Sequence, residues 1–327
     1  ALSLLEDETI AAKVRADYQY VFVDEYQDIN IIQHALLKAI VADKGSLFAI
    51  GDPNQSIYGF RGSQVSLFHR FNDDFAGAAT MYLNENYRSG ANILAASQQV
   101  ITAEVKEERS ALVARIYTQG KLVIHEAATD RREADFVAAM IEKLIGGMNM
   151  QRARHTAHAF GDIAVLYRLN AQRHCVTQAL DHLGIPYHVS AKPPKGGVYS
   201  DEEALGQYEE VLSYHAEKVS LLSMHAAKGL EFPIVFIIGC EDHLLPLDIE
   251  TMKGDVAEER RLFYVGMTRA REFLYLTHAN RRQLYGKTYQ HQPSLFLKDI
   301  QDDLKAFEAG KKHKPINKVD DGQLSLF

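Results

Sequence analysis

One short run, residues 21–28 (VFVDEYQD), constrains the fold of this chain more than any other. Three apolar residues, two of them β-branched, lead directly into the acidic pair Asp24 and Glu25. This pattern is typical of a buried strand of a parallel sheet that ends at a functional site. Ligands of open α/β sheets bind beyond the carboxyl ends of the strands, where these two carboxylates are expected. The alternative is a strand that ends in an ordinary acidic turn.

Strand-like and helix-like segments alternate along the chain, and this alternation predicts an α/β fold with parallel sheets. The expected strands are residues 20–23, 46–50, 80–83, 122–126, 162–168, 219–224, 234–238 and 273–277. The expected helices are residues 1–17, 30–42, a segment after Ser63, 93–105, 130–147 and 171–183.

The length of 327 residues suits two domains, each large enough to bury a core of its own. Residues 106–120 are charged and lack periodicity, so we place the boundary there, with a first domain at 1–110 and a second at 111–300. Residues 190–218 are expected to form a linker with one short acidic helix. Residues 301–327 are polar and charged and are expected to be a flexible tail.

The bulk properties indicate a cytoplasmic protein. No apolar run approaches the roughly 20 residues of a membrane span, and no secretory leader opens the chain. Cys175 and Cys240 are far apart and are expected to be reduced thiols. The net charge of −7 argues against a protein that coats duplex DNA, but it allows a single strand held in a local groove.

Five blocks of sequence resemble, in order, motifs II to VI of the UvrD/Rep/PcrA branch of superfamily 1 DNA helicases. The blocks are residues 21–28 (VFVDEYQD), 51–62 (GDPNQSIYGFRG), 83–89 (LNENYRS), 223–232 (SMHAAKGLEF) and 258–270 (EERRLFYVGMTRA). The resemblance extends from about residue 18 to about residue 297. It implies part of a first RecA-like domain and a complete second RecA-like domain, with ATP and Mg²⁺ bound between them.

The resemblance also implies roles for particular residues. The implied catalytic residues are Asp24 as the Mg²⁺ ligand, Glu25 as the base, Gln55 as the γ-phosphate sensor, and Arg88 and Arg269 as γ-phosphate clamps. The residues implied to bind the nucleotide are Tyr87, which would stack on adenine, and Glu231 near the ribose. Two guanidiniums suit the spread charge of a transferring phosphoryl group, although either arginine alone is more often a surface or salt-bridge residue.

Tyr58, Phe60, Arg61 and His225 are the expected DNA contacts. Closely spaced aromatic rings with an arginine can stack bases and hold phosphate without reading sequence. The family often has tryptophan where Phe60 stands, and His225 matches a strand-contacting histidine. The alternative is that Tyr58 and Phe60 are core aromatics.

A phosphate-cradling loop of the form G-x-x-x-x-G-K-[ST] is the main missing element. The only Gly-Lys-Thr run is residues 286–288, where Arg281 occupies the position of the first glycine. It follows the last strand, so we interpret it as a chance match. Without that loop the β- and γ-phosphates lose their main cradle. We therefore expect a fragment, one piece of a split enzyme, or a derived non-hydrolytic relative, and the isolated chain to be inactive as an ATPase.

The chain ends in Gln323, Leu324, Ser325, Leu326 and Phe327. This run resembles the pentapeptide by which many bacterial DNA-processing proteins dock on the sliding clamp, and apolar anchors on a disordered tail can fill a preformed groove. Residues 292–296 (QPSLF) look similar but match an ordinary segment of the family, so they are assigned no docking role.

The expected function is that of an ATP-dependent 3′→5′ DNA helicase or translocase acting on single-stranded DNA in repair or replication, without its N-terminal portion. The large accessory domain that the family inserts near residue 190 has no room here, which leaves duplex contacts and self-inhibition in question. The main alternative is a non-hydrolytic adaptor that binds DNA and the sliding clamp. A piece of a nuclease–helicase fusion is a weaker alternative, because no acidic nuclease cluster is visible.

Overall fold

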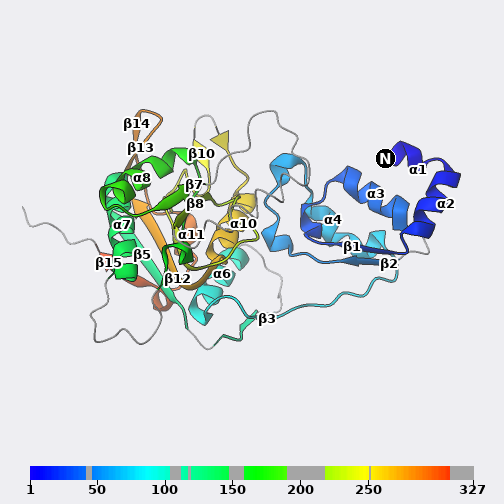
Figure 1. Cartoon of the computed structure of the whole chain (residues 1–327), viewed down its shortest axis with the longest axis horizontal. Helices are drawn as coiled ribbons and strands as arrows, with labels where there is room; N and C mark the ends of the chain where they lie inside the picture. Colours follow the sequence, from blue (N-terminus) through cyan, green and yellow to red (C-terminus); the bar gives the residue numbers. More distant parts are fainter. Residues whose placement is uncertain are drawn as a thin grey trace, which may run out of the picture.

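The computed structural model describes residues 1–41, 46–103, 112–116, 119–146, 158–189, 218–249 and 252–309. The expected linker and acidic helix between residues 190 and 217 lie outside this set, as does the clamp-like motif at 323–327. The described residues form two α/β lobes, drawn in blue and in cyan to red in Figure 1.

The first lobe is built on two parallel strands, β1 (Tyr20–Val23) and β2 (Ser46–Ala49), which are paired in register. Helices α1 (Leu2–Leu5), α2 (Glu8–Asp17) and α3 (Ile31–Val41) pack together beside them. A small core forms where Tyr26, Ile29 and Leu67 meet, next to α4 (Val65–His69) and α5 (Phe71–Asp74). The predicted strands 20–23 and 46–50 are therefore confirmed to within one residue.

This small sheet carries large exposed apolar side chains. Phe22 is 76% exposed, and Tyr20 and Phe48 are also more than half exposed. The predicted strand at residues 80–83 is wrong, because this segment has no strand pairing and Met81 is 85% exposed. A strand needs a neighbour for its backbone hydrogen bonds, and none of the described strands lies beside this segment. The next strand, β3 (Glu85–Asn86), instead pairs with β4 (Val113–Ala114).

The second lobe contains a seven-stranded sheet in the order β15-β5-β12-β9-β6-β8-β7, and every pairing in it is parallel. Its strands are β5 (Lys121–Ala127), β6 (Ile163–Tyr167), β7 (Tyr187–Val189), β8 (Val219–Ser223), β9 (Phe232–Ile237), β12 (Ala270–Ala279) and β15 (Ala306–Ala309). This confirms the predicted α/β fold class with a parallel sheet.

Helices cover both faces of this sheet (Figure 1). The core on one face includes α6 (Ala91–Thr102), α10 (Val256–Met267) and α11 (Leu295–Lys298), and the other core includes α7 (Asp130–Gly146) and α8 (Arg173–His182). Successive strand residues point to opposite faces, so Leu122 and Ile124 enter the first core and Val123 enters the second. The result is a three-layer α/β/α domain.

Helix α6 packs with this second sheet although it precedes the predicted boundary near residue 110. Ile93, Ala96 and Val100 are fully buried in the first core, and the Ser89 hydroxyl donates a hydrogen bond to the carbonyl oxygen of Ala270 at 2.6 Å. Residues 306–309, predicted to lie in a flexible tail, form the edge strand β15 beside β5.

Two runs of sequence that resemble functional motifs, residues 286–288 and 292–296, occupy ordinary structural positions. Strands β13 (Arg281–Leu284) and β14 (Lys287–Gln290) form a hairpin whose turn residues Tyr285 and Gly286 both have positive φ. The Gly-Lys-Thr run thus lies in a hairpin and not between a strand and a helix. Phe296 of the internal QPSLF run is fully buried in the core, as expected for a segment without a docking role.

Within the described residues, no helix is both long and apolar enough to cross a membrane. Both cysteines are free thiols; Cys240 is buried and Cys175 is half-buried.

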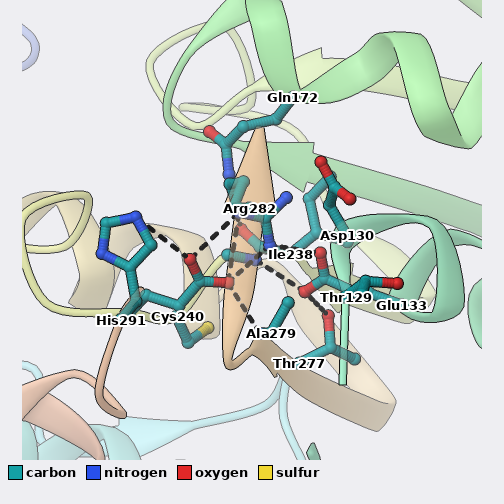
Figure 2. A network of polar contacts seen from close by, with 12 residues as sticks. Thr129, Asp130, Glu133, Gln172, Ile238, Cys240, Thr277, Ala279, Arg282 and His291 are labelled. Carbon is teal, nitrogen blue, oxygen red and sulfur yellow. Dashed lines mark hydrogen bonds and ion pairs between the residues drawn. The ribbon is translucent and has the colours of Figure 1, made fainter. Parts of the chain in front are cut away.

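Figure 2 shows a buried ionic network that ties the β13–β14 hairpin to the domain. Arg282 Nε lies 3.0 Å from Glu241 Oε2, and its Nη2 atom donates to Glu133. Glu133 Oε1 also accepts hydrogen bonds from the Thr277 hydroxyl at 2.6 Å and from the Gly239 amide at 2.9 Å. Burial opposes ionisation of Glu133, but Arg282 and these hydrogen bonds hold its pKa below the ordinary value. Burial dominates at Glu241 and raises its pKa.

We predict that Arg282→Met lowers the free energy of unfolding by about 3–5 kcal/mol, because two buried carboxylates lose their cation. Without Arg282 the folded pKa of each carboxyl lies above the unfolded value, so the loss is largest at high pH and shrinks as the pH falls. Urea unfolding at pH 8 and pH 5 measures this, with the exposed neighbour variant Arg281→Met as control. Equal, small losses for both variants would show that the network is dispensable.

Candidate nucleotide and single-strand site

Asp24 and Glu25 lie where strand β1 ends, and Gln55 lies in the 3₁₀ turn Pro53–Gln55 that follows β2. Because β1 and β2 are parallel, both ends meet at one edge of the sheet. Asp24 Oδ1 accepts a hydrogen bond from the Glu25 amide at 2.9 Å. Glu25 has a φ of 53°, a left-handed conformation that costs about 1–3 kcal/mol for a residue other than glycine. Both carboxylates are exposed.

The buried Gln27 side chain joins the two strand ends. Its amide nitrogen donates to Glu25 Oε2, and its oxygen accepts from the Asp52 amide at 2.9 Å. Asp52 Oδ2 in turn accepts from Gln55 Nε2 at 2.9 Å. A Cβ at Gly51 would come within 2.5 Å of Gln27 Oε1, so glycine there makes room for this bridge. The amide oxygen of Gln55 is left to accept from a partner elsewhere in the chain.

That partner is Arg269, which comes from the second lobe and is only 1% exposed. Its Nη2 atom lies 3.3 Å from Gln55 Oε1, while Nε and Nη1 donate to the carbonyl oxygens of Val265 and Leu230. Burial and the nearby Arg88 lower the pKa of Arg269 to about 10, so it remains charged at neutral pH. The structure therefore brings together two of the predicted catalytic residues from distant motifs.

Arg88 and Glu231 form a second cross-motif pair, with Arg88 Nε 2.5 Å from Glu231 Oε2. The charges of Arg88, Glu231 and Glu25 all act on Arg269, so these side chains belong to one polar cluster. Tyr87 is exposed, and its hydroxyl donates to Glu85. Among the described residues, Asp24 is joined to the cluster only through the backbone amide of Glu25, and the hydroxyl of Tyr87 bonds to Glu85, which is outside the cluster.

The aromatic residues of the 51–62 block form a second, adjoining group. The Tyr58 and Phe60 rings lie 6.0 Å apart, and the Phe60 and His225 rings meet edge to face at 5.5 Å. The Arg61 guanidinium lies 5.0 Å from the Tyr58 ring centroid. Phe60 is 67% exposed and so is no core aromatic, whereas Tyr58 is half-buried and packs against the core. We name Tyr58, Phe60, Arg61 and His225 the aromatic platform.

A cavity of about 460 Å³ opens beside the platform and is lined by Phe60 and His225 together with Arg168, Glu258 and Lys253. Glu258 Oε1 accepts a hydrogen bond from the Gly59 amide at 3.1 Å, so one wall of the cavity holds the platform loop. The volume is sufficient for a planar ring beside the exposed Phe60.

Several residues in the motif blocks acquire a role only in the structure. Arg261 Nε donates to the Ser56 carbonyl oxygen at 2.7 Å, and Lys228 contacts Asp28 and the carbonyl oxygen of Gln55. The only indication in the sequence that Arg261 and Lys228 matter was that they lie within the motif blocks. Which partner each side chain meets depends on how the two lobes dock, and the sequence does not encode that directly.

Burial lowers the pKa of His225 to about 4, and the charges of Arg168 and Arg61 act in the same direction. The imidazole is therefore neutral at pH 7 and can act on a strand as a flat ring and not as a cation. This favours stacking or hydrogen bonding to a base over a phosphate contact.

We predict that His225→Gln reduces the pH dependence of stability between pH 6.5 and pH 4. In this window the unfolded chain protonates residue 225 whereas the folded chain does not, so the wild type loses stability as the pH falls. The difference in free energy of unfolding between wild type and variant at pH 7 and at pH 5 measures this. His69→Gln, at an exposed histidine, serves as control and should leave the slope close to that of the wild type. An unchanged slope for His225→Gln would contradict the burial of a neutral imidazole.

Comparison with known proteins identifies the family. The UvrD-like helicase C-terminal domain model matches residues 81–193 and 200–281, and the UvrD/REP helicase N-terminal domain model matches residues 1–76. The ATP-dependent DNA helicase PcrA of Staphylococcus epidermidis is 26% identical over 449 residues, covering 92% of this chain and 60% of that protein. PcrA of Staphylococcus aureus is 27% identical over 448 residues, covering 91% and 60%.

The chain thus spans about 60% of the length of these relatives. Their alignments are longer than the 327 residues of this chain, so the relatives contain residues inside the matched span that are missing here. The C-terminal domain of a possible DNA helicase from Lactobacillus plantarum covers 68% of this chain and 98% of its own length at 16% identity, with a TM-score of 0.38 that is too low to bear on the fold. On the family-model matches, the chain belongs to the UvrD-like helicase family.

Proposed function

We propose that this chain is part of an ATP-driven DNA helicase or translocase of the UvrD/Rep type that moves 3′→5′ along single-stranded DNA in repair or replication. The contact between Arg269 and Gln55 carries the proposal. It joins a guanidinium of the second lobe to the strand-end loop of the first, at the position where a γ-phosphate would be sensed. The same loop continues into the aromatic platform three residues later.

The side chains present fit the γ-phosphate end of Mg²⁺-ATP. Asp24 would hold the metal, which neutralises phosphate charge when it is bound. Glu25 would orient the attacking water, and Arg88 and Arg269 would contact the terminal phosphate. Arg88 now pairs with Glu231, so a phosphate would compete with that carboxylate for the guanidinium. Tyr87 is exposed and bonds to Glu85 only through its hydroxyl, so its ring can stack on a base.

The cradle for the β- and γ-phosphates would come from polypeptide beyond these 327 residues. Further strands of the same sheet have a place to bind in this lobe. The strands β1 and β2 carry exposed apolar side chains such as Phe22 and Phe48, and the segment around Met81 is unpaired. In this proposal the added strands bring a G-x-x-x-x-G-K-[ST] loop to the edge that carries Asp24 and Glu25.

Two further aspects of the proposal concern partners. The aromatic platform and its cavity would take bases of single-stranded DNA, because ring faces stack on any base. The residues at 323–327 (QLSLF) would dock on a bacterial sliding clamp through Leu324, Leu326 and Phe327, with Gln323 fixing the register. They lie outside the described residues. A clamp pull-down with and without residues 323–327 tests this docking.

We predict that Phe60→Ala weakens binding of a fluorescein-labelled oligothymidylate about tenfold, since one stacked base contributes about 1–3 kcal/mol. Fluorescence anisotropy at fixed salt measures the affinity. Tyr285→Ala removes an equally exposed aromatic from the β13–β14 hairpin and should leave the affinity within about twofold. Equal losses for both variants would mean that the strand binds elsewhere.

We also predict that the isolated chain hydrolyses ATP no faster than its Glu25→Gln variant, with or without single-stranded DNA, because its 327 residues contain no G-x-x-x-x-G-K-[ST] run. A longer native product that contains this loop should show strand-stimulated turnover that Glu25→Gln abolishes. Strand-stimulated hydrolysis by the 327-residue chain, absent in Glu25→Gln, would refute the assignment of a half-site. If the native product binds single-stranded DNA but does not hydrolyse ATP, the alternative function is favoured, a non-hydrolytic adaptor that binds DNA and the sliding clamp.

A further inference from the structure

Lys228 is a buried cation that no predicted role accounts for. It follows β8 in a turn of the second lobe, yet its ammonium lies among residues of the first lobe, and only 7% of its side chain is exposed. Nζ donates to the carbonyl oxygen of Gln55 at 2.9 Å and lies 3.1 Å from Glu25 Oε2. It also pairs with Asp28 Oδ2, and it lies 5.2 Å from the Tyr58 ring centroid.

These contacts surround the ammonium with acceptors of the first lobe. Nζ donates hydrogen bonds to Asp28 and to the Gln55 carbonyl oxygen, forms an ion pair with Glu25, and lies beside the Tyr58 ring. Asp28 depends on this cation in return. Burial raises the pKa of Asp28 while Lys228 opposes that shift, and Asp28 Oδ1 has no hydrogen-bond partner among the described residues. Removing either member alone would therefore leave an uncompensated charge in a buried position.

The position of Lys228 differs from those of three other side chains of the second lobe that contact the first. Arg269 contacts Gln55, Glu258 contacts the Gly59 amide, and Arg261 contacts the Ser56 carbonyl. Each of these contacts reaches one of the two candidate sites. Lys228, in contrast, contacts both the candidate catalytic base and a ring of the aromatic platform.

We propose that Lys228 is a positioning residue that couples the aromatic platform to the candidate catalytic base. A base that stacks on the platform changes the surroundings of the Tyr58 ring, and the ammonium packed on that ring moves with it. Because the same ammonium holds the Glu25 carboxylate, strand occupancy changes the placement of Glu25. The inference rests on the proposed strand-binding function and adds to it the side chain through which the strand acts.

A single fluorophore makes this testable in the full chain. The chain contains no tryptophan, so Phe60→Trp introduces one reporter in the platform. Binding of unlabelled oligothymidylate is followed by quenching of that tryptophan. Three backgrounds carry the reporter: otherwise unchanged, Lys228→Met with Asp28→Asn, and Lys253→Met. The double variant removes both charges of the buried pair together, so no lone buried carboxylate remains. Lys253→Met removes an exposed lysine that lines the cavity beside the aromatic platform.

Glu25→Gln is then added to each background, and the change in strand affinity is the readout. We expect Glu25→Gln to shift the affinity at least about threefold in the reporter and Lys253→Met backgrounds and by less than about 1.5-fold in the double variant, and such non-additivity measures coupling through Lys228. Urea unfolding of every variant checks that the double variant is folded.

An equal effect of Glu25→Gln in all three backgrounds overturns the coupling role while leaving strand binding intact. Loss of the effect in the Lys253→Met background as well overturns it too, because general electrostatics would then explain the result. Absence of strand-induced quenching in the folded reporter chain, with no anisotropy change for the labelled strand, overturns the proposed strand function and this inference with it.

Discussion

A buried cation must find all of its acceptors inside the protein, and this requirement organises the whole structure. Arg282, Arg269 and Lys228 are the clearest cases. Arg282 finds Glu133 and Glu241 within its own domain, so it stabilises that domain from inside. Arg269 and Lys228 find Gln55, Glu25 and Asp28 in the other lobe. Because desolvating an unpaired charge is strongly unfavourable, these two side chains favour one docked arrangement of the lobes over alternatives that would leave them unpaired.

The two lobes differ in how completely their sheets are built. The second lobe has seven parallel strands with helices on both faces, which is what a parallel sheet requires. The first lobe pairs β1 only with β2 among the described strands, and Phe22 and Phe48 stay exposed. The candidate site residues Asp24, Glu25 and Gln55 nevertheless lie at the edge that both strands share. A site at a strand end needs the register of β1 and β2 and the Gln27 bridge, and both are present.

Much of the fold could be predicted because local patterns decided it. The alternation of short apolar strands with periodic helices identified most strands of the second sheet and helices on both of its faces. The expectation failed at residues 80–83, where an apolar run has no described strand to pair with, and at residues 306–309, where a segment expected to be a flexible tail pairs with β5. In both places the presence or absence of a neighbouring strand to accept backbone hydrogen bonds outweighed local composition. Helix α6 likewise belongs to the second domain because its apolar side chains pack in the core of that domain. The charged stretch that follows α6 in the sequence does not mark the domain boundary.

The sequence by itself determined the family and the residues of its motifs, because each motif is a short contiguous run of particular residues that can be identified without the structure. The family-model matches confirm the family. Only the tertiary structure decided which of these side chains meet: Gln55 with Arg269, Arg88 with Glu231, and Lys228 with Asp28 and Glu25. These partners lie far apart along the chain. Their contacts follow from docking two folded surfaces, and no periodicity or local propensity carries that information.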